Sequence, residues 1–155
     1  MIKINRKVEY GLVALKHMFS KPTGELTSVR EICDHYGTPF DPVAHVMRIL
    51  NSEGLVQSEQ GAYGGYRISE IKPDFSLAQF IEVVEGHTLA FADCFRDEDS
   101  RCQIMERCNV VDSMGVVHSK IKEVLDTIWL LDLLKVPNGG GRMPHPSPSN
   151  GHAHA

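Results

Sequence analysis

The sequence lacks several features that define large classes of protein. It contains no run of about 18 apolar residues, so it predicts no membrane span and no membrane partner. Its first residues enter a helical pattern without an apolar secretory segment, which favours a cytoplasmic location. It shows neither a Ser/His/Asp pattern nor a phosphate-binding glycine loop, and its cysteines have no paired general base. An enzyme is therefore the least favoured class.

Cysteine is scarce, with four in 155 residues, and clustered cysteines in a reducing compartment indicate metal or redox chemistry rather than structural disulfides. Cys94, Cys102 and Cys108 follow the spacing C-x7-C-x5-C in a charged loop. Such a loop can bring three thiolates to one soft metal centre, which predicts a metal or iron–sulfur site. A disulfide or three unrelated thiols are the alternatives, although one disulfide would leave a free cysteine. Cys33 lies apart, on an apolar helix face, and is expected to be buried rather than a ligand.

Net charge is also low, at −4, and it is unevenly distributed. Residues 1–72 carry nine Lys and Arg against eight Asp and Glu, whereas the rest carries seven against twelve. This weak basic bias of the first half is compatible with DNA contact without establishing it. The length fits one domain, or one small domain with an appended helix.

Hydrophobic periodicity predicts short helices and one hairpin. The helices are expected at about 5–20, 28–36, 41–52 and 76–85, and the strands at 55–59 and 65–69. Ser28 and Glu31 have the spacing of a capping box. Helix, helix–turn–helix and hairpin form the plan of a winged helix–turn–helix, which is a mainly α fold with a small β-wing. The alternative is a small core that serves as a protein-interaction module.

A heptad pattern follows the cysteines. Met114, Val117, Ile121 and Val124 continue to Ile128 and Leu131 in steps of three and four, which predicts a long C-terminal dimerisation helix. Burial within one chain is the alternative. The expected division is a DNA-binding domain (1–86), a cysteine-rich cluster-binding loop (87–111), the dimerisation helix (112–136) and a disordered Pro/Gly/Ser/His tail (137–155).

Together these motifs resemble a bacterial family of winged-helix regulators over about residues 2–135. That family includes the iron–sulfur-cluster assembly regulator, the nitric-oxide-sensitive repressor and the rhizobial-type iron regulator. The resemblance rests on the three cysteines before the heptads and on four segments: 4–15, 26–37, 51–56 and the wing 61–66. The segment around Cys94, followed by acidic residues, is most similar to the iron and nitric-oxide sensors.

The resemblance implies a homodimeric transcription regulator, often a repressor, that binds a palindromic operator in double-stranded DNA. It also implies an iron–sulfur cluster, 4Fe–4S or 2Fe–2S, held by Cys94, Cys102 and Cys108. The fourth ligand would be Glu9 of the other subunit, with His35 as the main competitor. Asn109 and its neighbours replace the ligand histidine of the assembly regulator, which makes that branch less similar.

The expected DNA-contacting surface departs from the family pattern. Gln60 stands where an arginine usually precedes the wing glycine, and Pro39, Asp41 and Pro42 open the recognition helix where small hydroxyl residues are common. The residues expected to contact DNA are Thr38, Asp41, His45 and Arg48 on the helix, with Tyr63 and Arg67 on the wing. A solvated surface is the alternative explanation for each.

The motifs and this resemblance together imply a DNA-binding regulator controlled by an iron–sulfur cluster that senses nitric oxide, iron or redox status. A cluster-free thiol-redox or zinc-bound regulator on the same fold is the first alternative. A cofactor-free adaptor that binds protein is the second.

Overall fold

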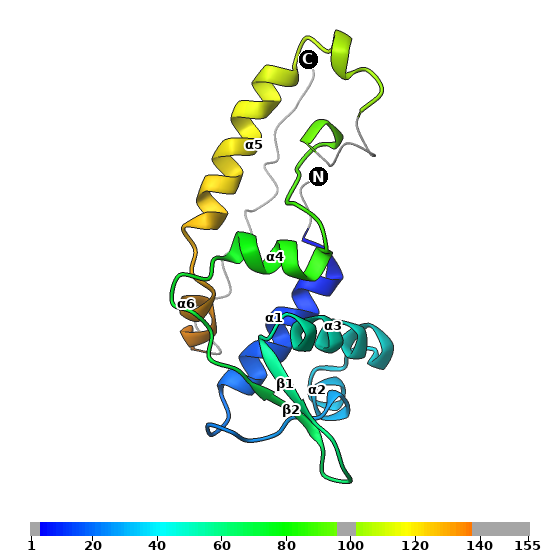
Figure 1. Cartoon of the computed structure of the whole chain (residues 1–155), viewed down its shortest axis with the longest axis vertical. Helices are drawn as coiled ribbons and strands as arrows, with labels where there is room; N and C mark the ends of the chain where they lie inside the picture. Colours follow the sequence, from blue (N-terminus) through cyan, green and yellow to red (C-terminus); the bar gives the residue numbers. More distant parts are fainter. Residues whose placement is uncertain (1–3, 96–101, 138–155) are drawn as a thin grey trace, which may run out of the picture.

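A computed structural model of the chain describes residues 4–95 and 102–137 (Figure 1). It is mainly helical with one two-stranded antiparallel sheet, so the predicted fold class is confirmed. The elements are α1 (Arg6–Phe19), α2 (Val29–Tyr36), α3 (Phe40–Ser52), β1 (Val56–Glu59), β2 (Gly65–Ile68), α4 (Leu77–Glu85), η1 (Asp93–Phe95), η3 (Met105–Arg107), α5 (Val111–Asp126) and α6 (Leu130–Lys135).

The core lies where α1 crosses α3 and α4. The side chain of Asn5 accepts a hydrogen bond from the backbone of Lys7 and caps the start of α1. Gly11 allows close helix packing, because a Cβ atom at that position would lie 2.9 Å from the buried ring of Phe80. Fully buried side chains from all three helices meet here: Val8, Leu15, Val43, Val46, Met47, Leu50, Phe80 and Val84.

The helix–turn–helix consists of α2, a short turn and α3. Ser28 caps α2 by accepting a hydrogen bond from the backbone of Glu31 at 3.0 Å. Gly37 ends α2 with φ of 65°, a left-handed conformation that suits glycine. α3 then buries one face, and its remaining face is available to a partner.

The wing is the hairpin of β1 and β2, in which Val56 pairs with Ile68 and Glu59 with Gly65. Strand β2 is attached to the loop before α2, because Thr27 and Tyr66 exchange backbone hydrogen bonds of 2.8 and 2.9 Å. A Cβ atom at Gly65 would lie 2.8 Å from the carbonyl oxygen of Thr27, so this close approach requires glycine.

The structure corrects the prediction that residues 112–136 form one helix. α5 stops before the end of this range. The amide of Leu77 donates to the carbonyl oxygen of Ile128 at 2.7 Å, and the amide of Leu130 donates to Phe75 at 2.9 Å. These hydrogen bonds to the start of α4 replace helical ones, so the helix breaks and α6 begins after the break.

The last part of the predicted dimerisation segment packs into the chain's own core. Leu130 and Leu134 of α6 are buried, and Ile128 and Leu131 pack against the same cluster. These two members of the predicted heptad pattern are thus used within one chain, as the intramolecular alternative proposed. α6 contacts α1 and completes the winged-helix domain.

α5 extends away from the core (Figure 1), and none of its residues is buried. One side contacts α4 and η1. Another side exposes Val117 and Val124, which together with Val110 before the helix recur at intervals of seven residues and are 47–58% exposed. An apolar stripe at this spacing is typical of a helix that packs on another helix.

The centre of the predicted cysteine loop and nearly all of the predicted tail, 137–155, lie outside the described residues. Among the helices that are described, none is long and apolar enough to cross a membrane.

Candidate DNA interface and metal centre

The exposed face of α3 carries three of the predicted DNA contacts. Asp41, His45 and Arg48 are all exposed and lie four and three residues apart, so they share one side of the helix. The opposite side is held in the core by its buried apolar residues. A helix anchored in this way can present polar side chains to a major groove.

The fourth predicted contact on this helix–turn–helix, Thr38, is less accessible. The residue is half-buried, and its hydroxyl oxygen is buried without a hydrogen-bond partner among the described residues. It lies in the turn before α3 rather than on the exposed helix face.

The wing presents its two predicted contacts differently. Tyr63 lies near the tip of the hairpin and is 94% exposed, so its ring is fully accessible. Arg67 lies on β2 and forms an ion pair with Glu59 of β1. This ion pair was not predicted. The sequence signal for it was the position of the two residues on opposite strands of the predicted hairpin. A phosphate would have to compete with the Glu59 carboxylate for the guanidinium group.

Sequence reasoning also missed a contact between an aromatic side chain at the start of α3 and a cationic side chain of α2. Phe40, its first residue, is 49% exposed, and the guanidinium carbon of Arg30 lies 5.9 Å from the centre of its ring. The sequence signal that could have revealed this contact was the aromatic Phe40 directly after the turn between α2 and α3.

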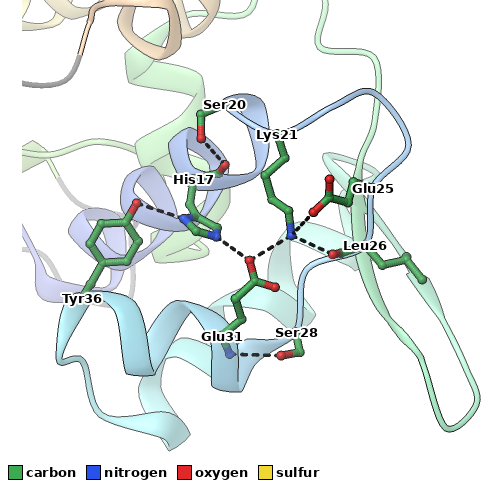
Figure 2. Close-up of polar contacts among 8 residues, drawn as sticks. All are labelled: His17, Ser20, Lys21, Glu25, Leu26, Ser28, Glu31 and Tyr36. Atoms are coloured by element: carbon green, nitrogen blue, oxygen red, sulfur yellow. Dashed lines mark hydrogen bonds and ion pairs between the residues drawn. The ribbon is translucent and has the colours of Figure 1, made fainter.

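A polar cluster fixes α2 against α1 (Figure 2). Nε2 of His17 lies 2.8 Å from the Glu31 carboxylate, and its Nδ1 lies 3.0 Å from the hydroxyl oxygen of Tyr36. The Lys21 ammonium donates to Glu31, to Glu25 and to the Leu26 carbonyl, each at 2.9 Å. The cluster therefore joins both ends of α2 to the C-terminal part of α1 and sets the position from which α3 begins.

The electrostatics of this cluster follow from its contacts. Burial alone would raise the pKa of Glu31, but hydrogen bonds from His17 and Lys21 outweigh it and hold that pKa below its ordinary value of 4.5. Burial likewise acts to lower the pKa of Lys21, and the hydrogen bonds to Glu31 and Glu25 raise it above 10.5. Both groups are therefore charged at neutral pH.

The cysteines predicted as ligands lie on the segments that precede α5. Cys94 lies in η1, Cys102 precedes η3, and Cys108 follows it. All three are free and half-buried, whereas Cys33 is free and buried in the core, as predicted. Within residues 4–95 and 102–137, no three His, Cys, Asp or Glu side chains lie close enough together to hold a metal ion.

The two candidates for a fourth ligand have other partners in the single chain. The carboxylate of Glu9 lies 3.0 Å from the Arg6 guanidinium one helical turn away, and its side chain is 42% exposed. His35 lies in the aromatic group around the polar cluster, with its ring centre 5.3 Å from that of His17 and 4.5 Å from that of Tyr36.

The cysteine segment contacts α5 through aromatic rings. Phe95, which follows Cys94, stacks on His118 with ring centres 4.5 Å apart. Phe91 lies edge-on to the same imidazole at 6.0 Å. This contact links the segment of one predicted ligand to the third turn of α5.

A helix–turn–helix with an exposed recognition face and a hairpin wing is the architecture of winged-helix DNA-binding proteins. The sequence profile of the Rrf2 family, described as iron-dependent transcriptional regulators, matches residues 4–136, and the chain belongs to this family. Its members are transcriptional regulators that bind DNA, not enzymes.

Three known proteins illustrate the similarity. The transcriptional regulator NsrR of Shouchella clausii is 23% identical over 136 residues, covering 86% of this chain and 89% of that protein. The structure of CymR, the global cysteine regulator of B. subtilis, is 28% identical with a TM-score of 0.63, covering 89% of this chain and all of that chain. The structure of T. potens IscR is 27% identical with a TM-score of 0.58, covering 86% of this chain and 87% of the other.

Proposed function

We propose that this chain is a homodimeric repressor whose operator binding is controlled by an iron–sulfur cluster held by Cys94, Cys102 and Cys108. The observation that carries the proposal is that three free, half-buried thiols lie on the segments just before α5. Similarity to NsrR and IscR supports the regulatory class, and the cluster would respond to nitric oxide, iron or redox status.

The donor set fits such a cluster. Thiolates are the usual protein ligands of iron–sulfur clusters, and these three have no disulfide partner. When bound, the cluster supplies soft iron that reacts with small oxidants and with nitric oxide. Glu9 from the partner subunit would be the fourth ligand, and its hard carboxylate would make that position easily exchanged.

The fold suggests how the thiols can control DNA binding. Ligation at Cys94 would fix the segment that Phe95 attaches to α5, and the exposed stripe of α5 would pack on the same helix of the partner. A shift of α5 would change the separation of the two recognition helices. Since half-sites lie about 34 Å apart on DNA, a small change in separation removes the contacts of one half-site.

Purification without oxygen tests this proposal. The protein should be brown and contain iron and acid-labile sulfide, and it should bind an inverted-repeat operator as a dimer. Cys94→Ala, Cys102→Ala and Cys108→Ala should each lose most of the cluster. The matched control is Cys33→Ala, because Cys33 is buried in the core and away from the segment, and it should retain the cluster.

A thiol-redox or zinc-bound regulator is the second candidate. Two observations favour it: the described residues contain no ready three-ligand group, and the chain is similar to CymR, named as a global cysteine regulator. Colourless protein that contains stoichiometric zinc, or that changes DNA affinity on thiol oxidation without iron, would replace the iron–sulfur proposal with this one.

A further inference from the structure

The start of the recognition helix combines an exposed ring with a cation. Phe40 is the first residue of α3, and about half of its surface is open to solvent. The exposed guanidinium group of Arg30, on the first turn of α2, lies over this ring. Such a contact contributes about 0.5–1 kcal/mol at an exposed site and restricts the ring to fewer orientations.

Arg30 also remains available to a negative partner. Among the described residues none of the ion pairs includes Arg30, whereas Arg6 and Arg67 are each paired with a glutamate. Stacking on a ring occupies the face of a guanidinium group and leaves its N–H edge free. That edge can donate two hydrogen bonds to a phosphate.

The position of Phe40 determines what its ring can contact. The N-terminal residues of a recognition helix meet the base edges in the major groove. Among the groups presented there, only the C5-methyl of thymine is apolar. The adjacent Asp41 is acidic and Thr38 has a buried hydroxyl, whereas Phe40 is the exposed aromatic side chain at this end of the helix, next to the smaller exposed rings of Pro39 and Pro42.

We propose that Phe40 is a specificity-determining residue that contacts a thymine methyl group in each half-site, while Arg30 orients its ring and binds a neighbouring phosphate. The inference rests on the DNA-binding part of the proposed function and is independent of the cluster. It adds a base contact that hydrogen-bonding residues such as His45 and Arg48 do not supply.

The test begins with selection of binding sites from a random duplex library by the anaerobically purified wild-type protein. Phe40→Ala and Phe40→Leu are selected in parallel. Wild type and Phe40→Leu should both enrich a motif with a fixed thymine in each half-site. Phe40→Ala should enrich the same motif but without a preferred base at the thymine position.

Replacement of the selected thymine by uracil removes only the methyl group. This change should weaken wild-type binding about fourfold per half-site, which corresponds to about 0.8 kcal/mol for one buried carbon. It should leave the affinity of Phe40→Ala unchanged. Arg30→Ala should weaken binding to all sequences. It should also reduce the slope of log affinity against log salt concentration by about the contribution of one phosphate contact per subunit.

Thermal unfolding of each variant separates a structural role from base contact, because a role limited to packing lowers the melting temperature without changing the motif. Equal uracil sensitivity in wild type and Phe40→Ala, with the same motif, would overturn this inference alone. A wild-type protein that enriches no motif would overturn it together with the proposed DNA binding.

Discussion

The imidazole of His118 lies nearly parallel to the ring of Phe95, with ring centres 4.5 Å apart and planes 18° apart. Phe95 follows Cys94 in the chain, and His118 lies on α5, so the stack joins the cysteine segment to the helix proposed to form the dimer. Nδ1 of His118 is buried and has no hydrogen-bond partner among the described residues. The same side chain thus provides a contact and carries an unsatisfied polar atom.

The first prediction follows from this atom. His118→Phe keeps an aromatic ring against Phe95 and removes the buried nitrogen, whose lack of a partner costs about 1–3 kcal/mol. The cluster-free variant should gain about 1 kcal/mol in free energy of unfolding, measured by urea titration. His87→Phe, at an exposed position, is the control and should change little. A loss of stability in His118→Phe would mean that Nδ1 has a partner in solution.

The second prediction concerns the dimer. Val124 is 58% exposed on the apolar stripe of α5, and Val116 is 65% exposed on another side of the same helix. Val124→Asp should yield folded monomers that lose operator binding, because a charge would be buried between two helices. Val116→Asp should remain dimeric. Light scattering at micromolar concentration measures both, and a monomeric wild type would contradict the proposal.

The third prediction separates two roles of Glu9. As a first-turn glutamate paired with Arg6, it stabilises α1 by about 0.3–1 kcal/mol through the helix dipole. As a ligand of the partner's cluster, its loss should also shift the visible absorbance and change the reaction rate with nitric oxide or oxygen. Glu9→Ala should show both effects. Arg6→Ala removes the ion pair but no ligand, so it should leave the absorbance and the reaction rate unchanged.

Mixed dimers test whether Glu9 acts across the subunit interface. A Glu9→Ala subunit paired with a subunit that lacks all three loop cysteines should place its own cluster opposite an intact Glu9, and the spectrum should be normal. If the spectrum and DNA affinity of Glu9→Ala homodimers equal those of wild type, His35→Ala becomes the variant to measure.

The fourth prediction uses two helical glycines. A Cβ atom at Gly11 would lie 2.9 Å from the Phe80 ring and 3.3 Å from Val46, so Gly11→Ala should lower stability by about 1–3 kcal/mol. The nearest atoms to a Cβ at Gly115 lie 3.8 Å away, in the ring of Phe95, so Gly115→Ala should raise stability by about 0.5–1 kcal/mol. If Gly11→Ala and Gly115→Ala changed the stability equally in thermal unfolding, helix propensity rather than packing would determine both effects.

The fifth prediction concerns acid stability. The pKa of Glu31 in the folded chain lies below 4.5, so below pH 4.5 the unfolded chain takes up the proton first. The stabilisation by Glu31 is complete above pH 4.5 and is lost as the pH falls through the folded pKa. Glu31→Gln should therefore lose stability at pH 7, and its deficit should shrink toward pH 3. Urea midpoints across this range measure it, with exposed Glu53→Gln as control.

Local sequence signals determined most of the elements. Asn5 caps α1, Gly37 ends α2 in a left-handed conformation, and the glycine-rich segment between β1 and β2 turns the hairpin. These signals act within a few residues, so they can be read without knowledge of the fold. The exposure of Asp41 and His45 follows equally from helical periodicity.

Tertiary contacts decided what the local signals left open. The predicted capping box of α2 is only half formed, because His17 of α1 and Lys21 of the loop after it bind the carboxylate of Glu31. The reciprocal box forms instead at Ser76 and Gln79, where no competing partner takes the glutamine side chain.

The break after α5 has the same kind of cause. Periodicity continues through Ile128 and Leu131, but hydrogen bonds to Leu77 and Phe75 redirect the backbone and bury α6 against α1. The predicted sites also combine features that the sequence determines with features that depend on packing. The spacing of the cysteines is a property of the sequence, whereas the stack of Phe95 on His118 and the pairing of Arg30 with Phe40 join residues on different elements. Only the packing of those elements brings such residues together, because no periodic pattern within one helix or strand records a neighbour on another.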